Sequence, residues 1–329
     1  MFSDATILIT GGTGSFGRAF VRQIFQDYTP RKVVVYSRDE LKQYEMAQEF
    51  DQRGLRFLIG DIREKDRLTV AMKGVDYVVH AAALKQVPAA EYNPMECIKT
   101  NIHGAENVVH AAWDEGVRKV VALSTDKAAN PVNLYGATKL ASDKLLVAAN
   151  NMGGSAEPRF SVVRYGNVAG SRGSVLPYFR ELKANGSESL PITDPAMTRF
   201  WITVEEGVNF VIKAFQRMKG GEIFVPKIPS IRIIDLAKVV APQLKQEVVG
   251  LRPGEKIHEM MCPRENSHLT LEFHDHFVIQ PAIQFFDQDG DYSINRLGER
   301  GRLVNPDFEY SSGINPDFLS VPQLRKQLI

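Results

Sequence analysis

The sequence predicts an α/β protein built on a doubly wound, parallel β-sheet with a smaller C-terminal domain. Short β-branched runs alternate with longer amphipathic segments up to about Arg164. Alternation of this kind predicts a parallel sheet with helices on both faces. The runs expected to form buried strands are Thr6–Thr10, Lys32–Tyr36, Arg56–Ile59, Tyr77–His80, Lys119–Ser124 and Phe160–Arg164.

The composition changes after Gly170, where glycine, proline and serine become frequent. These residues indicate excursions of the chain away from the sheet. We therefore expect a first domain of residues 1–170, to which about 201–226 returns. A second domain is expected from 171–200 and 227–329, with a ligand cleft between the two.

Composition argues against several classes of partner. Lys and Arg total 40 against 39 Asp and Glu, so no basic excess favours nucleic acid or an anionic membrane. Apolar runs are shorter than the roughly 20 residues of a membrane helix, and the N-terminus lacks signal-peptide features. Cys97 and Cys262 suit a reducing cytoplasm. His274 and His276 have no third ligand at suitable spacing, so we expect no metal.

A glycine-rich segment, Thr10–Gly17, follows the first predicted strand with the spacing G-x-x-G-x-x-G. It leads into a segment with apolar residues at every fourth position, which predicts a helix. A tight strand-to-helix turn is the simpler alternative, but a strand before and a helix after favour a Rossmann-type dinucleotide site. Backbone close to a pyrophosphate is then expected at Gly11, Thr13, Gly14, Ser15, Phe16 and Gly17.

The end of the second predicted strand indicates which dinucleotide binds. An acid there binds the ribose of NAD, whereas a cation accommodates the extra phosphate of NADP. Ser37 and Glu40 have capping-box spacing, so a helix is expected to begin at Arg38. Arg38 and Lys42 would bind the phosphate, although both could be solvated surface cations. Asp61, after the third strand, is expected at the adenine edge or as a helix N-cap.

Tyr135 and Lys139 are the candidate catalytic pair, one helical turn apart after the fifth predicted strand. The unperturbed pKa of tyrosine is about 10. A lysine ammonium one turn away and a positively charged nicotinamide would both favour the phenolate. Amphipathic packing is the alternative, but the position at the carboxyl end of a parallel strand favours proton transfer.

Four further segments carry a resemblance: Ser124–Ala128, Pro131–Tyr135, Met197–Phe200 and Arg252–Lys256. With the loop and the tyrosine–lysine pair, nearly the whole chain resembles the extended short-chain dehydrogenases/reductases that act on nucleotide sugars. These segments are similar to those of the inverting UDP-N-acetylglucosamine 4,6-dehydratases of pseudaminic-acid biosynthesis. The resemblance implies an NADP-dependent lyase acting on a UDP-sugar as a homo-oligomer, a dimer or hexamer.

The resemblance also implies a redox-neutral cycle. Tyr135 deprotonates the 4-hydroxyl while a hydride leaves carbon 4 for NADP, and the new ketone acidifies the proton on carbon 5. Loss of that proton and of the 6-hydroxyl as water is followed by return of the hydride to carbon 6 and of a proton to carbon 5. The expected product is UDP-2-acetamido-2,6-dideoxy-β-L-arabino-hex-4-ulose.

Asp126 and Lys127 are the candidates for the remaining proton transfers. Retaining dehydratases resemble this chain but carry Asp-Glu here, so Lys127 implies the inverting subgroup. We assign Asp126 to the departing hydroxyl and Lys127 to carbon 5, although the two roles could be exchanged. As a base, Lys127 needs a pKa well below its ordinary value, which burial could provide. A surface salt bridge between them is the structural alternative.

The resemblance places further residues around the ligands. Arg199 and Arg252 suit a diphosphate, because an arginine fork binds two oxygens at once, although each could instead pair with a carboxylate. The remaining alternatives are a retaining dehydratase, a nucleotide-sugar 4-epimerase and a non-catalytic NADP-sensing protein. The implied substrate contacts are Lys85, Thr125, Asn167, Val175, Thr193, Arg199, Arg252 and Glu255, and the further cofactor contacts are Ile62, Ala81, Ala82, Ala83 and Asn101.

Overall fold

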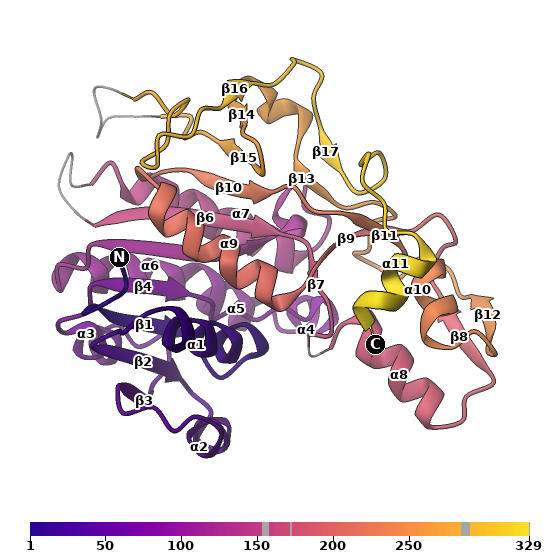
Figure 1. Cartoon of the computed structure of the whole chain (residues 1–329), viewed down its shortest axis with the longest axis horizontal. Coiled ribbons are helices and arrows are strands. Elements are labelled where there is room, and N and C mark those ends of the chain that lie inside the picture. Colours follow the sequence, from indigo (N-terminus) through magenta and orange to yellow (C-terminus); the bar gives the residue numbers. More distant parts are fainter. Residues whose placement is uncertain (153–157, 172, 284–289, 329) are drawn as a thin grey trace.

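The centre of the molecule is a ten-stranded sheet of order β16-β14-β15-β10-β6-β5-β4-β1-β2-β3 (Figure 1). It is seen in a computed structural model that describes residues 1–152, 158–171, 173–283 and 290–328. Arg172, within the glycine- and serine-rich segment noted above, lies outside the described residues. The predicted α/β class with a mostly parallel sheet is confirmed.

The six predicted strands all form, each within one residue of its expected ends. The apolar side chains of the central strands are mostly buried because helices cover both faces of the sheet, whereas the edge strand β3 leaves Ile59 50% exposed. They pair in parallel, and β10 (Ile223–Pro226) adds a seventh parallel strand beside β6. The six are β1 (Thr6–Thr10), β2 (Lys32–Ser37), β3 (Leu55–Ile59), β4 (Tyr77–His80), β5 (Lys119–Thr125) and β6 (Arg159–Tyr165).

Two groups of helices cover the two faces of the sheet. On one face α1 packs against α9, which crosses β5 and β6 (Figure 1). On the other, α7 packs on the same two strands and on α6, which contacts α3. The helices of this half are α1 (Ser15–Asp27), α2 (Glu40–Glu49), α3 (Lys65–Met72), α4 (Val87–Tyr92), α5 (Pro94–Ile98), α6 (Gly104–Asp114), α7 (Leu134–Ala149) and α9 (Val204–Arg217), with a π-helix η1 (Lys99–His103) and a 3₁₀ turn η2 (Asp126–Ala128).

A second apolar core lies in the other half of the molecule, on the right of Figure 1. Leu176, Trp201 and Leu236 are among its buried side chains. Around it lie α8 (Val175–Ala184), α10 (Ile233–Val240) and α11 (Val321–Leu328), the three-stranded sheet of β7 (Asn167–Val168), β9 (Thr198–Ile202) and β11 (Ser230–Arg232), and the pair of β8 (Ser189–Ile192) and β12 (Lys245–Val248). A further pair is β13 (Met260–Cys262) and β17 (Tyr310–Ser311), and η3 (Arg264–Leu269) precedes β14.

The division into two domains stays a prediction, and the sheet departs from it in one respect. β14 (Thr270–Glu272), β15 (His276–Ile279) and β16 (Arg302–Leu303) come from the segment assigned to the second domain but extend the main sheet as antiparallel strands. Long-range pairing with β10 determines this position, since β15 is completely buried there. This part of 227–329 therefore belongs to the main sheet.

Two features of the described residues bear on membranes and on metal ions. No described helix combines the length and apolar character needed to cross a membrane. Within the same residues, no group of three or more histidine, cysteine or acidic side chains is placed to hold a metal ion.

Candidate active site

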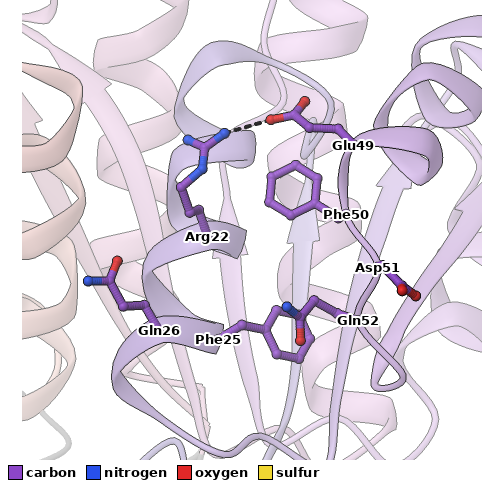
Figure 2. Close-up of a pocket in the computed structure, with 7 residues that line it drawn as sticks. All are labelled: Arg22, Phe25, Gln26, Glu49, Phe50, Asp51 and Gln52. Atoms are coloured by element: carbon purple, nitrogen blue, oxygen red, sulfur yellow. Dashed lines mark hydrogen bonds and ion pairs between the residues drawn. The ribbon is translucent and has the colours of Figure 1, made fainter.

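A cleft of about 1250 Å³ runs along the carboxyl ends of the parallel strands. Ligands of open α/β sheets bind at this edge. Apart from Asn101, every site residue predicted from the sequence lines the cleft. A second hollow of about 290 Å³, between α1 and the end of α2, contains none of them (Figure 2). Its wall is closed by an ion pair between Arg22 and Glu49.

The glycine loop is shaped for close approach of a ligand to its backbone. Gly11 has φ +66°, and a Cβ there would lie 2.9 Å from the Ala82 backbone. A Cβ on Gly17 would lie 2.1 Å from the carbonyl oxygen of Gly12. Only glycine fits both places; α1 begins at Ser15, so Gly17 lies in its first turn. The first amides of α1 therefore face the cleft, which suits a pyrophosphate.

The second helix does not begin where the sequence predicted. Ser37 is the last residue of β2, paired with Ile59, and its hydroxyl accepts from the Gln43 side chain at 3.1 Å instead of from a helix amide. Asp39 is the N-cap instead, and its carboxylate accepts a hydrogen bond from the Lys42 amide at 3.0 Å. The predicted Ser37 capping box was wrong, and α2 begins at Glu40.

Both predicted phosphate cations have carboxylate partners. Lys42 pairs with Asp39, and Arg38 lies 3.4 Å from Asp61. Acids from the N-cap of α2 and from the end of β3 therefore lie beside both cations. Burial would raise the pKa of Asp61, but hydrogen bonds from Arg63 lower it, so the carboxylate stays charged. Asp61 does not cap α3, which begins at Lys65.

Asn101 supports the cofactor side of the cleft from behind. It lies in the π-helix η1, and only 1% of it is exposed. Its amide accepts from the Leu84 amide at 2.8 Å, donates to the Leu84 carbonyl at 2.9 Å and donates to Thr138 Oγ1 at 3.0 Å. These bonds fix the segment that follows β4, and they direct the side chain away from the cleft. Asn101 does not line the cleft, and its contact with the cofactor stays a prediction.

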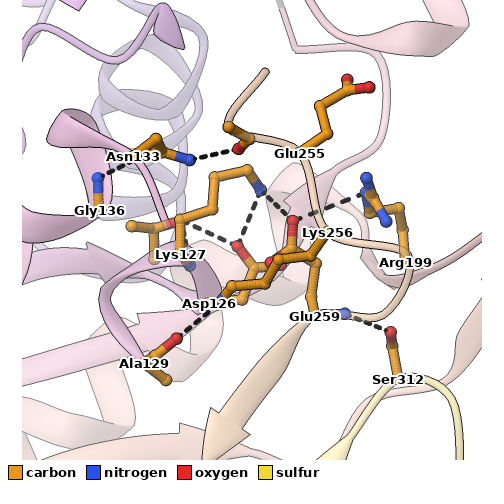
Figure 3. Close-up of polar contacts among 12 residues, drawn as sticks. Asp126, Lys127, Ala129, Asn133, Gly136, Arg199, Glu255, Lys256, Glu259 and Ser312 are labelled. Carbon is orange, nitrogen blue, oxygen red and sulfur yellow. Dashed lines mark hydrogen bonds and ion pairs between the residues drawn. The ribbon is translucent and has the colours of Figure 1, made fainter. Parts of the chain in front are cut away.

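The catalytic pair lies at the start of α7. Asn133 caps this helix by accepting from the Gly136 amide at 2.8 Å, and it donates to the Gly254 carbonyl at 2.8 Å (Figure 3). Burial raises the pKa of Tyr135 to about 12, against the positive charge of Lys127 and a hydrogen bond with Thr125. Burial also lowers the pKa of Lys139. The expected lowering of the tyrosine pKa is therefore not produced by the protein alone.

Asp126 and Lys127 belong to a buried charge cluster rather than to a surface salt bridge (Figure 3). Lys127 Nζ lies 3.0 Å from Asp126 Oδ1 and 3.1 Å from Glu259 Oε1. Burial alone would lower the pKa of Lys127, but these two carboxylates raise it above its ordinary value. The expectation of a lowered lysine pKa was wrong, because two acids share one ammonium group.

The pKa of Asp126 is raised, which suits a proton donor. Burial is the largest cause, the charge of Lys127 opposes it, and the charge of Glu259 adds to it. Only 1% of Asp126 is exposed, so water does not screen these charges.

Glu259 is the functional candidate that the sequence did not reveal. It precedes β13, and its backbone is held by Ser312, whose hydroxyl accepts from the Glu259 amide at 2.9 Å and whose amide donates to the Glu259 carbonyl at 2.8 Å. It follows the Arg252–Lys256 motif closely, but no spacing rule connects it with Lys127. Only the tertiary structure brings the two together.

The two arginines expected at the diphosphate differ in availability. Arg199 is buried, donates to the carbonyls of Thr198 and Ile257 at 2.6 and 3.1 Å, and lies 3.7 Å from Glu259. Arg252 pairs with Glu255, but 70% of its side chain is exposed. Arg252 is therefore the cation better able to turn toward a diphosphate.

The cleft contains buried polar atoms without a hydrogen-bond partner among the described residues. Among them are Asn167 Oδ1, Ser174 Oγ and Glu255 Oε2, on the side of the cleft where the sugar nucleotide is expected. Buried polar atoms are normally satisfied, so these are places where a ligand would supply the missing bonds.

Two known proteins are similar in sequence to this chain over most of their length. The chain is 59% identical over 324 residues, 98% of its length and 97% of the relative's, to a UDP-N-acetylglucosamine 4,6-dehydratase (inverting) of Campylobacter jejuni subsp. jejuni serotype O:23/36 (strain 81-176). It is 44% identical over 286 residues, 85% of its length and 84% of the relative's, to a UDP-glucose 4-epimerase of Rickettsia canadensis (strain McKiel).

The structure also resembles solved structures. The X-ray structure of Pen from Bacillus thuringiensis matches with a TM-score of 0.89 and 37% identity, covering 100% of this chain and 98% of that one. The family model described as polysaccharide biosynthesis protein matches residues 7–281. The chain therefore belongs to the polysaccharide biosynthesis protein family and has the extended short-chain dehydrogenase/reductase fold.

Proposed function

We propose that the protein catalyses the NADP-dependent, redox-neutral 4,6-dehydration of UDP-N-acetylglucosamine with inversion at carbon 5. The observation that carries the proposal is the placement of Asp126 and Lys127 in the cleft at the end of β5. The inverting dehydratase, similar over almost its whole length, supports the same activity.

The glycine loop is the expected place for the cofactor, since Gly11 and Gly17 permit the tight turn that puts the first amides of α1 at the cleft, where a pyrophosphate would bind. A nicotinamide dinucleotide bound there supplies the hydride acceptor and donor, and a positive charge beside Tyr135. Tyr135 accepts the proton of the 4-hydroxyl. Because burial raises its pKa to about 12, that added positive charge is needed to favour the phenolate.

Asp126 and Lys127 handle the two later protons. Asp126, whose pKa is raised, gives a proton to the departing 6-hydroxyl. Lys127 is assigned to the removal of the carbon 5 proton; because the product is inverted, the returning proton reaches carbon 5 from the opposite face and from a different donor. Taking the earlier proton from carbon 5 requires the amine, so Lys127 must first pass a proton to a neighbouring carboxylate.

The experiment that tests the function is dehydration of UDP-N-acetylglucosamine in deuterated water, followed by mass spectrometry and proton NMR at early times. We expect loss of one water, one deuterium at carbon 5, and the L-arabino-hexulose as first product. Early sampling matters, because a proton beside a ketone exchanges unaided. An exclusively D-xylo first product would rule out inversion while leaving dehydration intact.

A Lys127→Glu variant is the companion test, since it restores the charge that retaining enzymes carry at this place. We expect it to lose inversion at carbon 5. Inversion as efficient as in the wild type would show that another group handles that proton.

One relative favours a second candidate, a nucleotide-sugar 4-epimerase, through the 44% identity noted above. Oxidation and re-reduction at carbon 4 requires no acid for a 6-hydroxyl. An epimerase therefore does not need a proton donor such as Asp126, whose pKa is raised. The same experiment separates the two, because an epimerase product keeps its mass and gains no deuterium at carbon 5. A retaining dehydratase would give the D-xylo product, and a non-catalytic NADP sensor would give none.

Cofactor choice gives a further prediction. Arg38 has a half-exposed side chain and only a 3.4 Å contact with Asp61, so it can turn to a ribose phosphate. We expect NADP(H) to raise the melting temperature more than NAD(H), and Arg38→Glu to remove this difference. Thermal shift measures both, and Arg56→Glu on β3, outside the cleft lining, is the control. An undiminished NADP preference in Arg38→Glu would place the phosphate elsewhere.

We also propose that the protein acts as a homo-oligomer in the cytoplasm and that its product enters pseudaminic-acid biosynthesis. The motif resemblance supports the pathway and the assembly, and the two cysteines, both buried thiols, suit a reducing compartment.

A further inference from the structure

Glu259 is a buried carboxylate on the wall opposite the catalytic loop. It is 2% exposed, lines the cleft, and its Oε1 contacts Lys127 at 3.1 Å and Arg199 at 3.7 Å (Figure 3). Its position is fixed, because Ser312 holds its backbone through two hydrogen bonds. A carboxylate in so dry a place needs partners of opposite charge.

The charges around it come from several elements. η2 provides Asp126 and Lys127, β9 provides Arg199, and the segment before β13 provides Lys256, whose ammonium donates to the Ala129 carbonyl at 2.6 Å. Burial would raise the pKa of Glu259, but Lys127, Arg199 and Lys256 together hold it below its ordinary range. Glu259 is therefore the ionised acid of the cluster.

Asp126 is the other acid, and its surroundings favour the protonated form. Two carboxylates share the Lys127 ammonium, and like charges in a dry site do not both ionise readily. Asp126 Oδ1 accepts from Thr125 and Lys127 at 2.9 and 3.0 Å, whereas its buried Oδ2 has no partner among the described residues. A proton on Oδ2 would therefore be available to a ligand in the cleft.

We propose that Glu259 is a positioning residue of the dehydration: its fixed negative charge holds the Lys127 ammonium and, by disfavouring a second negative charge beside it, makes Asp126 carry the proton that the departing 6-hydroxyl receives. This inference rests on the proposed function. It gives the C-terminal part of the chain, through Glu259, a role in the proton transfers. The residues on the loops after the parallel strands do not supply this role.

The protons and electrons balance as follows. Lys127 passes one proton to Glu259 Oε1, 3.1 Å away, and its amine takes the proton of carbon 5. The electron pair left on carbon 5 forms the new double bond to carbon 6. The bond from carbon 6 to oxygen breaks with its pair on oxygen, which takes the Asp126 proton and leaves as water. Once the amine has taken the carbon 5 proton, Lys127 is again an ammonium beside a neutral Glu259, so Asp126 becomes the stronger acid when it must donate.

Infrared difference spectra test the charge arrangement without turnover. At neutral pH the wild type should show a protonated-carboxyl band that Asp126→Asn removes. Glu259→Gln, which keeps the shape but loses the charge, should remove the same band because Asp126 then ionises. Glu259→Asp, which keeps the charge, should retain it. The matched control is Glu222→Gln, a buried glutamate bonded to Ser161 and outside the cleft lining, which should leave the Asp126 band in place.

The pH profile of dehydration supplies the second readout. Asp126 must be protonated to act, so activity is lost as pH rises through its pKa. Removing the Glu259 charge lowers that pKa, so the basic limb of kcat in Glu259→Gln should move down by about one pH unit. We also expect kcat to fall by about 10²-fold.

Three results would overturn the inference: no protonated band lost in Asp126→Asn, a band that persists in Glu259→Gln, or an unmoved basic limb. The wild-type and Asp126→Asn spectra decide the first even if Glu259→Gln does not fold. A wild type that forms no dehydration product would instead remove the proposed function, while the spectra still report the charge arrangement.

Discussion

Tyr135→Phe is expected to lower kcat for dehydration by about 10²–10⁴-fold, the usual size of a general acid–base contribution. The change removes one oxygen from a partly buried ring at the first turn of α7, so the fold and cofactor binding should persist. Steady-state kinetics, cofactor titration and thermal unfolding measure the three properties separately. Activity within about tenfold of the wild type would make Tyr135 a structural residue.

The matched control is Tyr310→Phe. Tyr310 is buried and lies outside the cleft lining, where its hydroxyl donates to the Ile228 carbonyl at 2.8 Å and accepts from the Ile228 amide at 2.9 Å. This variant should lose stability through two broken hydrogen bonds while kcat stays near the wild-type value. The pair of variants thus separates loss of a reacting oxygen from loss of a buried hydroxyl.

The sheet was predictable where local sequence and tertiary structure agree. The β-branched runs of the central strands are mostly buried on both faces, and the pattern alone places all six strands within one residue. Ser37 and Glu40 have capping-box spacing, but the Ser37 hydroxyl accepts from Gln43 and Asp39 caps α2 instead. β15 joins the sheet through contacts with β10, which is distant in sequence and leaves no local signal.

The site residues likewise fall into those that the local sequence predicts and those whose role depends on tertiary structure. Residues on the loops after β1 to β6 could be predicted, because parallel strands bring their carboxyl ends to one edge. The ionisation of Lys127 could not, because it depends on Glu259, which reaches it from another part of the chain. Asn101 shows the converse, since a polar side chain near the cofactor loop is used to fix Leu84 instead.

Behind the catalytic helix lies a buried ion pair whose removal should have the largest effect on stability. Arg164 of β6 and Asp143 of α7 are 2% and 1% exposed, with Nη2 and Oδ2 3.1 Å apart. Arg164 also donates to the Met261 carbonyl at 2.9 Å, and Ser124 Oγ donates to Asp143 at 2.8 Å. The pair thus connects α7, β5, β6 and β13 beneath the site.

Asp143→Ala should lower the free energy of unfolding by about 3–5 kcal/mol, because it leaves the Arg164 guanidinium buried without a countercharge. Urea-induced unfolding measures the loss. The double variant Asp143→Ala/Arg164→Met is the control, since it replaces both charges and should recover most of the stability. A loss below about 1 kcal/mol in the single variant, or no recovery in the double one, would contradict the assignment. The pH profile of activity is a second readout. Burial lowers the pKa of Lys139, and the charge of Asp143 raises it. In the single variant the Lys139 ammonium should therefore lose its proton at a lower pH than in the wild type.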